Sequence, residues 1–233
     1  MTAELVSKKT PQGILPPLES GDRLSRNEFH RRYASLPRIK KAELIEGVVY
    51  MPSPVSTKRH GNPHFRLITW LGAYEARTSG VEGGDNSSLV LDLANEPQPD
   101  AFLRILPESG GQTGTDKNGY VEGGPELIGE VAATTASYDL HDKLRAYFRH
   151  GVQEYVVWRV AQQEIDWFVW DAGGYERLAP NAKRLYQSRV FPGLWLDPAA
   201  LIAGNMTRVL EVAARGIASK EHTAFVRRLQ RAR

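Results

Sequence analysis

Apolar residues follow two patterns along the chain, and each pattern predicts one kind of secondary-structure element. Apolar residues at three- and four-residue spacings predict amphipathic helices. This spacing occurs at residues 25–36, 60–79 and 137–150. Phe65 and Tyr74 fall on the expected apolar stripe of the second helix. Ser25 and Glu28, at the start of the first helix, have the spacing of a capping box.

Short runs of β-branched and aromatic residues predict strands. They occupy residues 42–51, 88–93, 98–106, 126–131, 154–160 and 164–170, with weaker candidates at 175–178 and 189–196. The first run can turn at Glu46-Gly47 as a tight hairpin, which Pro52 and Pro54 end. Residues 109–124 are rich in Gly, Ser, Thr and Asp, which predicts a long loop that could act as a flap.

The order of these elements predicts the fold class. A helix, three strands, a helix and a strand follow one another over residues 60–160. We therefore expect an α/β (α+β) protein whose mixed central sheet is flanked by helices around one core, with an extra β-hairpin and C-terminal helices. The expected organisation is a flexible N-terminal tail at 1–22, one domain at 23–197 and a helical extension at 198–233.

Composition narrows the chemistry that the chain can perform. Its 233 residues include no cysteine, which excludes disulfides, thiol catalysis and cysteine-based metal sites. Any metal ion would be held by oxygen or imidazole ligands. The sequence shows neither an apolar stretch long enough for a membrane span nor an apolar signal core, so we expect a cytoplasmic protein without membrane contact.

Charge is unevenly distributed behind the net value of +3. Residues 1–66 carry 12 basic and 6 acidic side chains, residues 67–204 carry 11 and 19, and residues 205–233 carry 7 and 2. Basic ends thus flank an acidic middle. This pattern fits a polyanion partner if metal ions offset the central carboxylates, and it also fits charges scattered over solvated helices.

Two carboxylates stand in otherwise apolar strands. Asp100 follows Gln98-Pro99, and Glu130 lies near the end of the run ELIGEV. A carboxylate in an apolar strand is costly unless it is paired or binds a metal. If the two strands are neighbours, Asp100 and Glu130 could hold Mg²⁺ together. The alternative is that both face solvent from half-buried strands.

The helix expected at 137–150 offers a lysine for the same chemistry. Asp139, Lys143 and Tyr147 lie along one face of it, so Lys143 could orient a water or stabilise developing charge. The alternative is a weak surface ion pair between Asp139 and Lys143. His60 and His64 are four residues apart, and His60 could contact the site as a base or phosphate ligand.

Five motifs in order resemble a known family. They read ELIEG, MPSP, QPD, ELIGEVA and SYDLHDKLRAYFRHGVQEYVVW, over roughly residues 40–180. In these motifs the chain resembles the Uma-two family, described as putative restriction endonucleases, within the PD-(D/E)XK nuclease superfamily. The resemblance implies a restriction-endonuclease-like core with Asp from the second strand and Glu from the third.

By position, the resemblance implies that Asp100 and Glu130 are metal ligands and that Lys143 is the catalytic lysine. Glu46 matches an acidic position that could approach the same site, and the alternative is a turn residue exposed to water. The chain departs from the superfamily at Ala132, where a standard E-X-K motif has lysine, so a side chain from the following helix would replace it.

A second departure concerns the residues after Glu130. Many relatives read EVLSPST there, whereas this chain reads EVAATTA. Hydroxyls of Thr134, Thr135 or Ser137 could still cap the next helix and help to place a phosphate at its N-terminus.

The motifs and the resemblance together indicate a hydrolase: a Mg²⁺- or Mn²⁺-dependent endonuclease acting on DNA. Asp100, Glu130 and Lys143 are its expected catalytic residues, with Glu46, His60 and Tyr147 as accessory candidates. The alternative is a DNA- or protein-binding module that keeps the fold without cleaving. A carboxylate-pair hydrolase of sugars is a third class, but the aromatic-rich groove that it needs is not evident. A homodimer could form through an exposed hairpin edge at 164–170.

Overall fold

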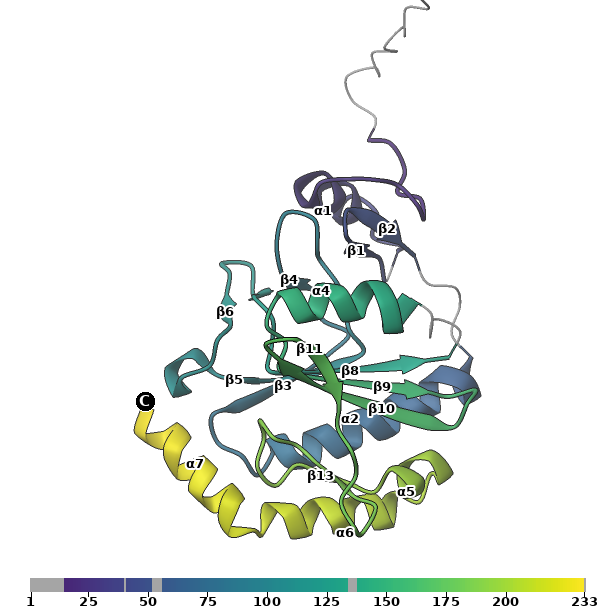
Figure 1. The fold of residues 1–233 in the computed structure, drawn as a ribbon. Helices are drawn as coiled ribbons and strands as arrows, with labels where there is room; N and C mark the ends of the chain where they lie inside the picture. Colours follow the sequence, from purple (N-terminus) through teal and green to yellow (C-terminus); the bar gives the residue numbers. More distant parts are fainter. Residues whose placement is uncertain (1–14, 40, 52–55, 134–137, 233) are drawn as a thin grey trace, which may run out of the picture.

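A six-stranded mixed sheet forms the centre of the protein, with helices on both faces (Figure 1). The computed structural model describes residues 15–39, 41–51, 56–133 and 138–232. The strand order is β11-β10-β9-β8-β5-β3, in which β8 and β9 are parallel and the other neighbours antiparallel. In chain order these strands are β3 (Val81–Asp85), β5 (Ala101–Ile105), β8 (Leu127–Ala132), β9 (Glu154–Arg159), β10 (Glu164–Asp171) and β11 (Gly174–Arg177).

Helices cover the two faces of the sheet unequally (Figure 1). One face carries α4 (Leu144–Arg149), which continues from the π-helical turn η3 (Asp139–Lys143). The other face carries α2 (Asn62–Glu75), preceded by the π-helical turn η1 (Thr57–Gly61), together with three C-terminal helices. These are α5 (Pro198–Ala203), α6 (Met206–Ile217) and α7 (Lys220–Ala232).

Smaller elements surround this sheet. The hairpin β1 (Glu43–Ile45) and β2 (Val48–Tyr50) packs with α1 (Arg26–Ala34) at the edge of the molecule. A three-stranded sheet joins β4 (Leu89–Val90), β7 (Val121–Glu122) and β6 (Gly114–Thr115), the last following the 3-10 turn η2 (Pro107–Ser109). Strands β12 (Tyr186–Gln187) and β13 (Trp195–Leu196) form a further pair. No described helix has the length and apolar character that crossing a membrane requires.

Side chains of β8 alternate between two apolar cores, and this alternation sets the direction of Glu130. Leu127 and Val131 belong to the core between the sheet and α2, whereas Ile128 and Ala132 belong to the core beneath α4. Since alternate residues of a strand share a face, Glu130 points toward α4 with Ile128 and Ala132.

The fold confirms the expected mixed sheet flanked by helices, together with the β1–β2 hairpin and the C-terminal helices. Glu46 and Gly47 both have positive φ, of 52° and 73°, as the tight hairpin turn requires. Pro52 and Pro54 lie outside the described residues, as do Thr134, Thr135 and Ser137.

The domain boundaries stay predictions. Of the expected tail, Leu18 is buried beside α1, and residues 1–14 lie outside the described part of the chain. The C-terminal helices contribute Val209, Phe225 and Leu229 to the core shared with α2.

Two details of the expected helices are wrong. The side chain of Ser25 makes no capping hydrogen bond at α1, and the Glu28 carboxylate accepts from Arg31 and Arg32. Phe65 is 73% exposed. The buried stripe of α2 is carried by Leu67, Trp70, Leu71 and Tyr74, because these residues face the sheet and α6.

Strand β3 was not expected, and the run 164–170 is not a sheet edge. Residues 81–85 read VEGGD, in which Val81 is the one β-forming side chain, yet this segment pairs with β5 along its whole length. Strand β10 pairs with β9 on one side and β11 on the other, so the proposed dimer edge at 164–170 is occupied within the chain.

Candidate functional site

Asp100 and Glu130 face each other across neighbouring strands. Ala101 of β5 pairs with Gly129 of β8, so Asp100, one residue before β5, stands opposite Glu130. The backbone N–H of Asp100 donates to Glu130 Oε2 at 3.3 Å, and that of Val131 donates to Asp100 Oδ2 at 2.9 Å. Asp100 is 2% exposed and Glu130 is 3% exposed. The expectation that the strands are neighbours is confirmed, and the alternative of solvent-facing carboxylates is wrong.

Lys143 and Tyr147 reach Glu130 from the helix above. Lys143 Nζ lies 2.8 Å from Glu130 Oε1, and the Tyr147 hydroxyl donates to the same oxygen at 3.1 Å. Lys143 Nζ also lies 3.7 Å from Asp139 Oδ1, but the lysine is buried, so a surface ion pair does not describe it. The fold therefore brings Asp100, Glu130 and Lys143 together.

Two further charged residues reach the site that the sequence analysis did not single out. Lys41 Nζ lies 3.0 Å from Asp100 Oδ1, and Glu43 Oε1 lies 2.9 Å from Lys143 Nζ. Glu43 also accepts from the backbone N–H of Gln98 at 2.8 Å. Its position was detectable, because Glu43 stands at the start of a strand of buried residues, much as Asp100 directly precedes β5.

Glu46 does not reach this cluster. It stands in the β1–β2 turn, where its side chain is partly exposed and ion-paired with Arg149. None of the contacts described for Glu46 involves Asp100, Glu130 or Lys143. The acidic residue that the β1–β2 segment supplies to the site is Glu43, because the strand points it inward whereas the turn lies at the surface.

Two histidines, one in η1 and one at the start of α2, contact Asp100. His60 Nε2 lies 3.1 Å from Asp100 Oδ2, so His60 is placed at the site as expected. His64 Nε2 lies 2.9 Å from the carbonyl oxygen of Asp100 and 3.0 Å from Asp85 Oδ1. Within the described parts of the chain, no three His, Asp or Glu side chains form a ready-made metal cluster.

Burial and neighbouring charges move the pKa values of the two carboxyls in opposite directions. Burial alone would raise the pKa of Asp100, but the His60 hydrogen bond and the Lys41 charge hold it below its ordinary value. Burial raises the pKa of Glu130 to about 8, and the charge of Asp100 acts in the same direction against Lys143. Burial also opposes the charge of Lys143, but the carboxylates of Glu130 and Glu43 raise its pKa, so the lysine stays cationic.

The charge balance of the site fits a divalent cation. Among the described residues, four buried carboxylates, those of Glu43, Asp100, Glu130 and Asp139, lie beside Lys41 and Lys143, and His60 lies beside Asp100. A divalent cation would stabilise the ionised form of Glu130, and the carboxylates offer oxygen donors, the ligands that Mg²⁺ prefers.

An unpartnered hydroxyl lies at the same place. The ring of Tyr138 lies 5.4 Å from Lys143 Nζ. Its hydroxyl is buried without a hydrogen-bond partner among the described residues. Because an unpaired buried polar group is costly, this hydroxyl is suited to bind a ligand or water at the site.

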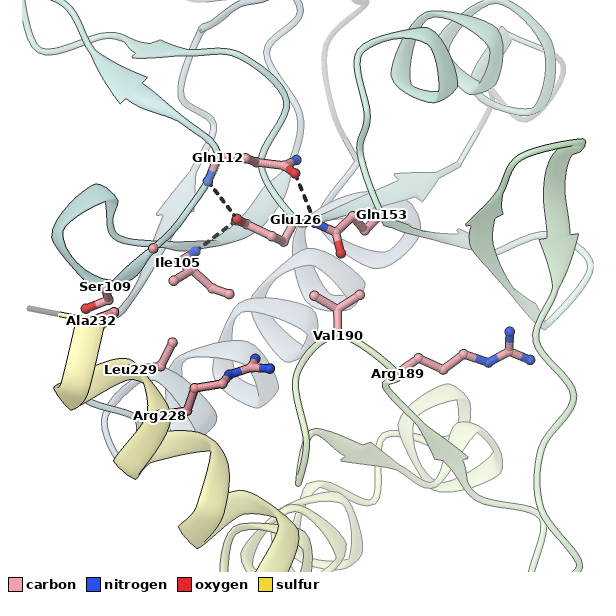
Figure 2. A pocket seen from close by; sticks show the side chains of 11 residues that line it. Ile105, Ser109, Gln112, Glu126, Gln153, Arg189, Val190, Arg228, Leu229 and Ala232 are labelled. Atoms are coloured by element: carbon pink, nitrogen blue, oxygen red, sulfur yellow. Dashed lines mark hydrogen bonds between the residues drawn. The ribbon is translucent and has the colours of Figure 1, made fainter.

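A cavity of about 520 Å³ lies away from this cluster, between α7 and the sheet (Figure 2). Figure 2 shows Glu126 accepting backbone hydrogen bonds from Ile105 at 2.9 Å and Gln112 at 3.1 Å. Glu126 precedes Glu130 by four residues, which is about 13 Å of extended strand. The carboxylate of Glu126 therefore binds backbone N–H groups at the end of β8 that is farther from Glu130.

Comparisons with known proteins agree with the geometry. A family model described as "Uma2: Putative restriction endonuclease" matches residues 26–199. A solved structure described as a putative nuclease belonging to DUF820, from Anabaena variabilis ATCC 29413, is similar with a TM-score of 0.55 and 14% sequence identity. The similarity covers 74% of this chain and 97% of the other, and at this identity it shows a common fold. No curated protein matches the chain.

Proposed function

Because this chain belongs to the Uma2 family of putative restriction endonucleases, we propose that it is a metal-dependent endonuclease that hydrolyses DNA phosphodiester bonds. The observation that carries the proposal is the buried, facing pair of Asp100 and Glu130, with Lys143 Nζ 2.8 Å from Glu130. The carboxylate oxygens of this pair are the ligands that Mg²⁺ or Mn²⁺ prefers.

The proposal assigns the metal to Asp100 and Glu130, whose neighbouring groups control their orientation. When bound, the ion supplies an acidified water nucleophile and offsets charge on the phosphodiester. His60 and Lys41 hold Asp100 ionised, and the Tyr147 hydroxyl fixes one oxygen of Glu130. Tyr147 is therefore a positioning residue, because it acts through Glu130.

Lys143 supplies the cation that the E-X-K position lacks. Ala132 stands two residues after Glu130 on the same strand face, where its methyl group cannot reach a phosphate. Lys143 reaches the site from η3 instead, and since it stays protonated it donates hydrogen bonds rather than accepting a proton. Its role is to hold Glu130 and to stabilise the charge of in-line attack, which leaves a 3′-hydroxyl.

Basic residues beside the site support a polyanion substrate. Lys58 and Arg59 are exposed on η1, directly before His60, which contacts Asp100. Cations in this place favour binding of a phosphate backbone and make it salt-dependent. These residues belong to the basic segment 1–66.

One observation favours the alternative of a binding module that does not cleave. Asp100 and Glu130 are already ion-paired with Lys41 and Lys143 and almost inaccessible to solvent. Cleavage therefore requires Lys41 and Lys143 to move away from the carboxylates so that a metal ion and the substrate can bind there. Binding without cleavage does not require this movement.

A nuclease assay separates the two functions. We expect the native chain to cleave plasmid and single-stranded DNA with Mg²⁺ or Mn²⁺ and to stop when EDTA removes the metal. Glu130→Gln keeps the size of the side chain but removes its charge, so cleavage should fall by about 100-fold or more. Equal activity in both proteins would indicate a contaminating nuclease. Absence of activity in both would support the binding module.

The pKa of Glu130 gives a pH dependence of stability. In the metal-free folded protein this pKa is about 8, above the ordinary 4.5, so the folded state keeps a proton that the unfolded chain releases. The contribution of Glu130 is therefore complete below about pH 4.5 and is lost as the pH rises toward about 8. Through this one group, the free energy of unfolding changes by at most about 1.4 kcal/mol per pH unit.

Urea unfolding in EDTA across this pH range measures the effect. The pKa of Glu154 is also raised, to about 7, so only the difference between the native chain and Glu130→Gln isolates Glu130. We expect the unfolding free energy of the native chain, minus that of Glu130→Gln, to fall as the pH rises. Parallel curves for the two proteins would contradict the assignment.

A further inference from the structure

A second cavity lies directly beside the carboxylates, on the same face of the sheet. Its volume is about 480 Å³, within the range of about 300–1,000 Å³ typical of ligand pockets. Asp100, Phe102 and Arg104 alternate along β5, so they share one face, and the latter two line the cavity. The cavity thus begins about 7 Å along the strand from Asp100.

The floor of this cavity is aromatic. Phe102 pairs across the strands with Gly84 of β3. A Cβ atom on Gly84 would lie 2.1 Å from the Phe102 ring, so the ring occupies the space that any other side chain would need. Gly83 and Gly84 both line the cavity. The VEGGD strand therefore makes room for the Phe102 ring beneath the cavity floor, where the ring is 3% exposed.

Two tyrosines line the cavity beside this floor. Tyr33 of α1 stacks on Phe29 at 5.6 Å between ring centroids, and Tyr120 contacts the edge of His30 at 5.6 Å. Both rings are half-buried and held by residues of one helix. Rings fixed in this way can stack on a planar ligand at little entropic cost.

The polar groups of the cavity indicate a neutral ligand with hydrogen-bonding edges. Arg104 is the one cation among the described lining residues, and it is already paired with Glu82. Gln98 Nε2 donates to the carbonyl oxygen of Asn86 at 2.6 Å, which orients the amide. Gln98 Oε1 is then buried without a partner among the described residues, and an N–H donor would satisfy it.

The cavity is coupled to the carboxylates through its rim. Asn86 Oδ1 accepts from Lys41 at 3.3 Å, and Lys41 binds Asp100. The backbone N–H of Gln98 donates to Glu43, which binds Lys143. A ligand that contacts Asn86 or Gln98 would therefore lie next to the residues that bind Asp100 and Lys143.

We propose that this cavity receives an unpaired nucleobase of the strand whose backbone lies at Asp100 and Glu130. Aromatic walls, polar edges and the lack of a free cation suit a base rather than a phosphate. The proposal rests on the proposed function in taking the bound strand as the substrate. It implies a preference for single-stranded or flipped nucleotides over intact duplex.

Binding measured in EDTA tests this without requiring cleavage. The probe is a fluorescein-labelled single-stranded DNA oligonucleotide, compared with an abasic oligonucleotide of the same length and with a duplex, by fluorescence anisotropy. We expect the native chain to bind the intact single strand about tenfold or more tightly than the abasic one. Tyr120→Ala should remove that preference and leave abasic binding unchanged, and Tyr120→Phe should restore it.

Trp170→Ala is the matched control, because Trp170 is a 43% exposed aromatic residue on β10, whose neighbour β11 is the sheet edge opposite β3. It should keep the preference for the intact strand. Equal native binding of intact and abasic strands, no binding of either, or equal losses on both in Tyr120→Ala would overturn the proposal. If the native chain prefers the intact strand but shows no nuclease activity, the base-binding site is supported and only the proposed cleavage is rejected.

Discussion

Replacing Asp100 by asparagine is expected to lower Mg²⁺-dependent DNA cleavage by at least about 100-fold, because it removes one of two proposed metal ligands. The substitution preserves side-chain volume in a site where Asp100 is 2% exposed. It removes the charge that pairs with Lys41 Nζ at 3.0 Å and His60 Nε2 at 3.1 Å. Initial rates on supercoiled plasmid, over a range of Mg²⁺ concentrations, measure the loss.

The matched control is Asp171→Asn, the same chemical change at an exposed position at the end of β10. Its cleavage rate should stay within about twofold of the native rate, since surface changes away from a site act weakly. Circular dichroism should show both variants folded. If folded Asp100→Asn cleaved at the native rate, Asp100 would not be a metal ligand.

Replacing Lys143 by methionine is expected to destabilise the fold by about 3–5 kcal/mol at a pH near 8, because it leaves buried carboxylates without their cation. Lys143 lies 2.8 Å from Glu130 and 2.9 Å from Glu43, and all three residues are buried. The loss should be larger above about pH 8, where native Glu130 is ionised, than near pH 5, where Glu130 carries a proton and less charge is left unpaired. Cleavage should be lost at every pH.

Arg149→Met is the control for this substitution. Arg149 is paired with Glu46, but both side chains are substantially exposed, and exposed ion pairs contribute about 0–1 kcal/mol. Chemical denaturation at two pH values compares the variants. A change below about 1 kcal/mol for Lys143→Met near pH 8 would contradict the buried charge cluster that defines the site.

Local patterns predicted much of the site, because they depend on residues close together in the sequence. Asp100 and Glu130 were recognisable as carboxylates in apolar strands, and Lys143 as a lysine on the following helix. The motif resemblance made the family assignment possible. Glu43 also stands at the start of an apolar strand, but the family motif matches Glu46 instead.

Contacts between distant segments could not be read from those patterns. Lys41 reaches Asp100 across 59 positions of sequence. Phe65 satisfied the helical period of α2, yet it is exposed, because the orientation of the helix against the sheet places Trp70 inward instead.

The sequence by itself determined the types of most elements and the mixed sheet, because periodicity is a local property, and its family motifs pointed to Asp100, Glu130 and Lys143 as candidate site residues. Only the tertiary structure decided that VEGGD is a strand, since its glycines suit β5 only where the Phe102 ring lies over Gly84. It also decided the charge balance of the site, because burial and the pairing of Glu43 and Lys41 with distant partners arise when strands and helices pack together.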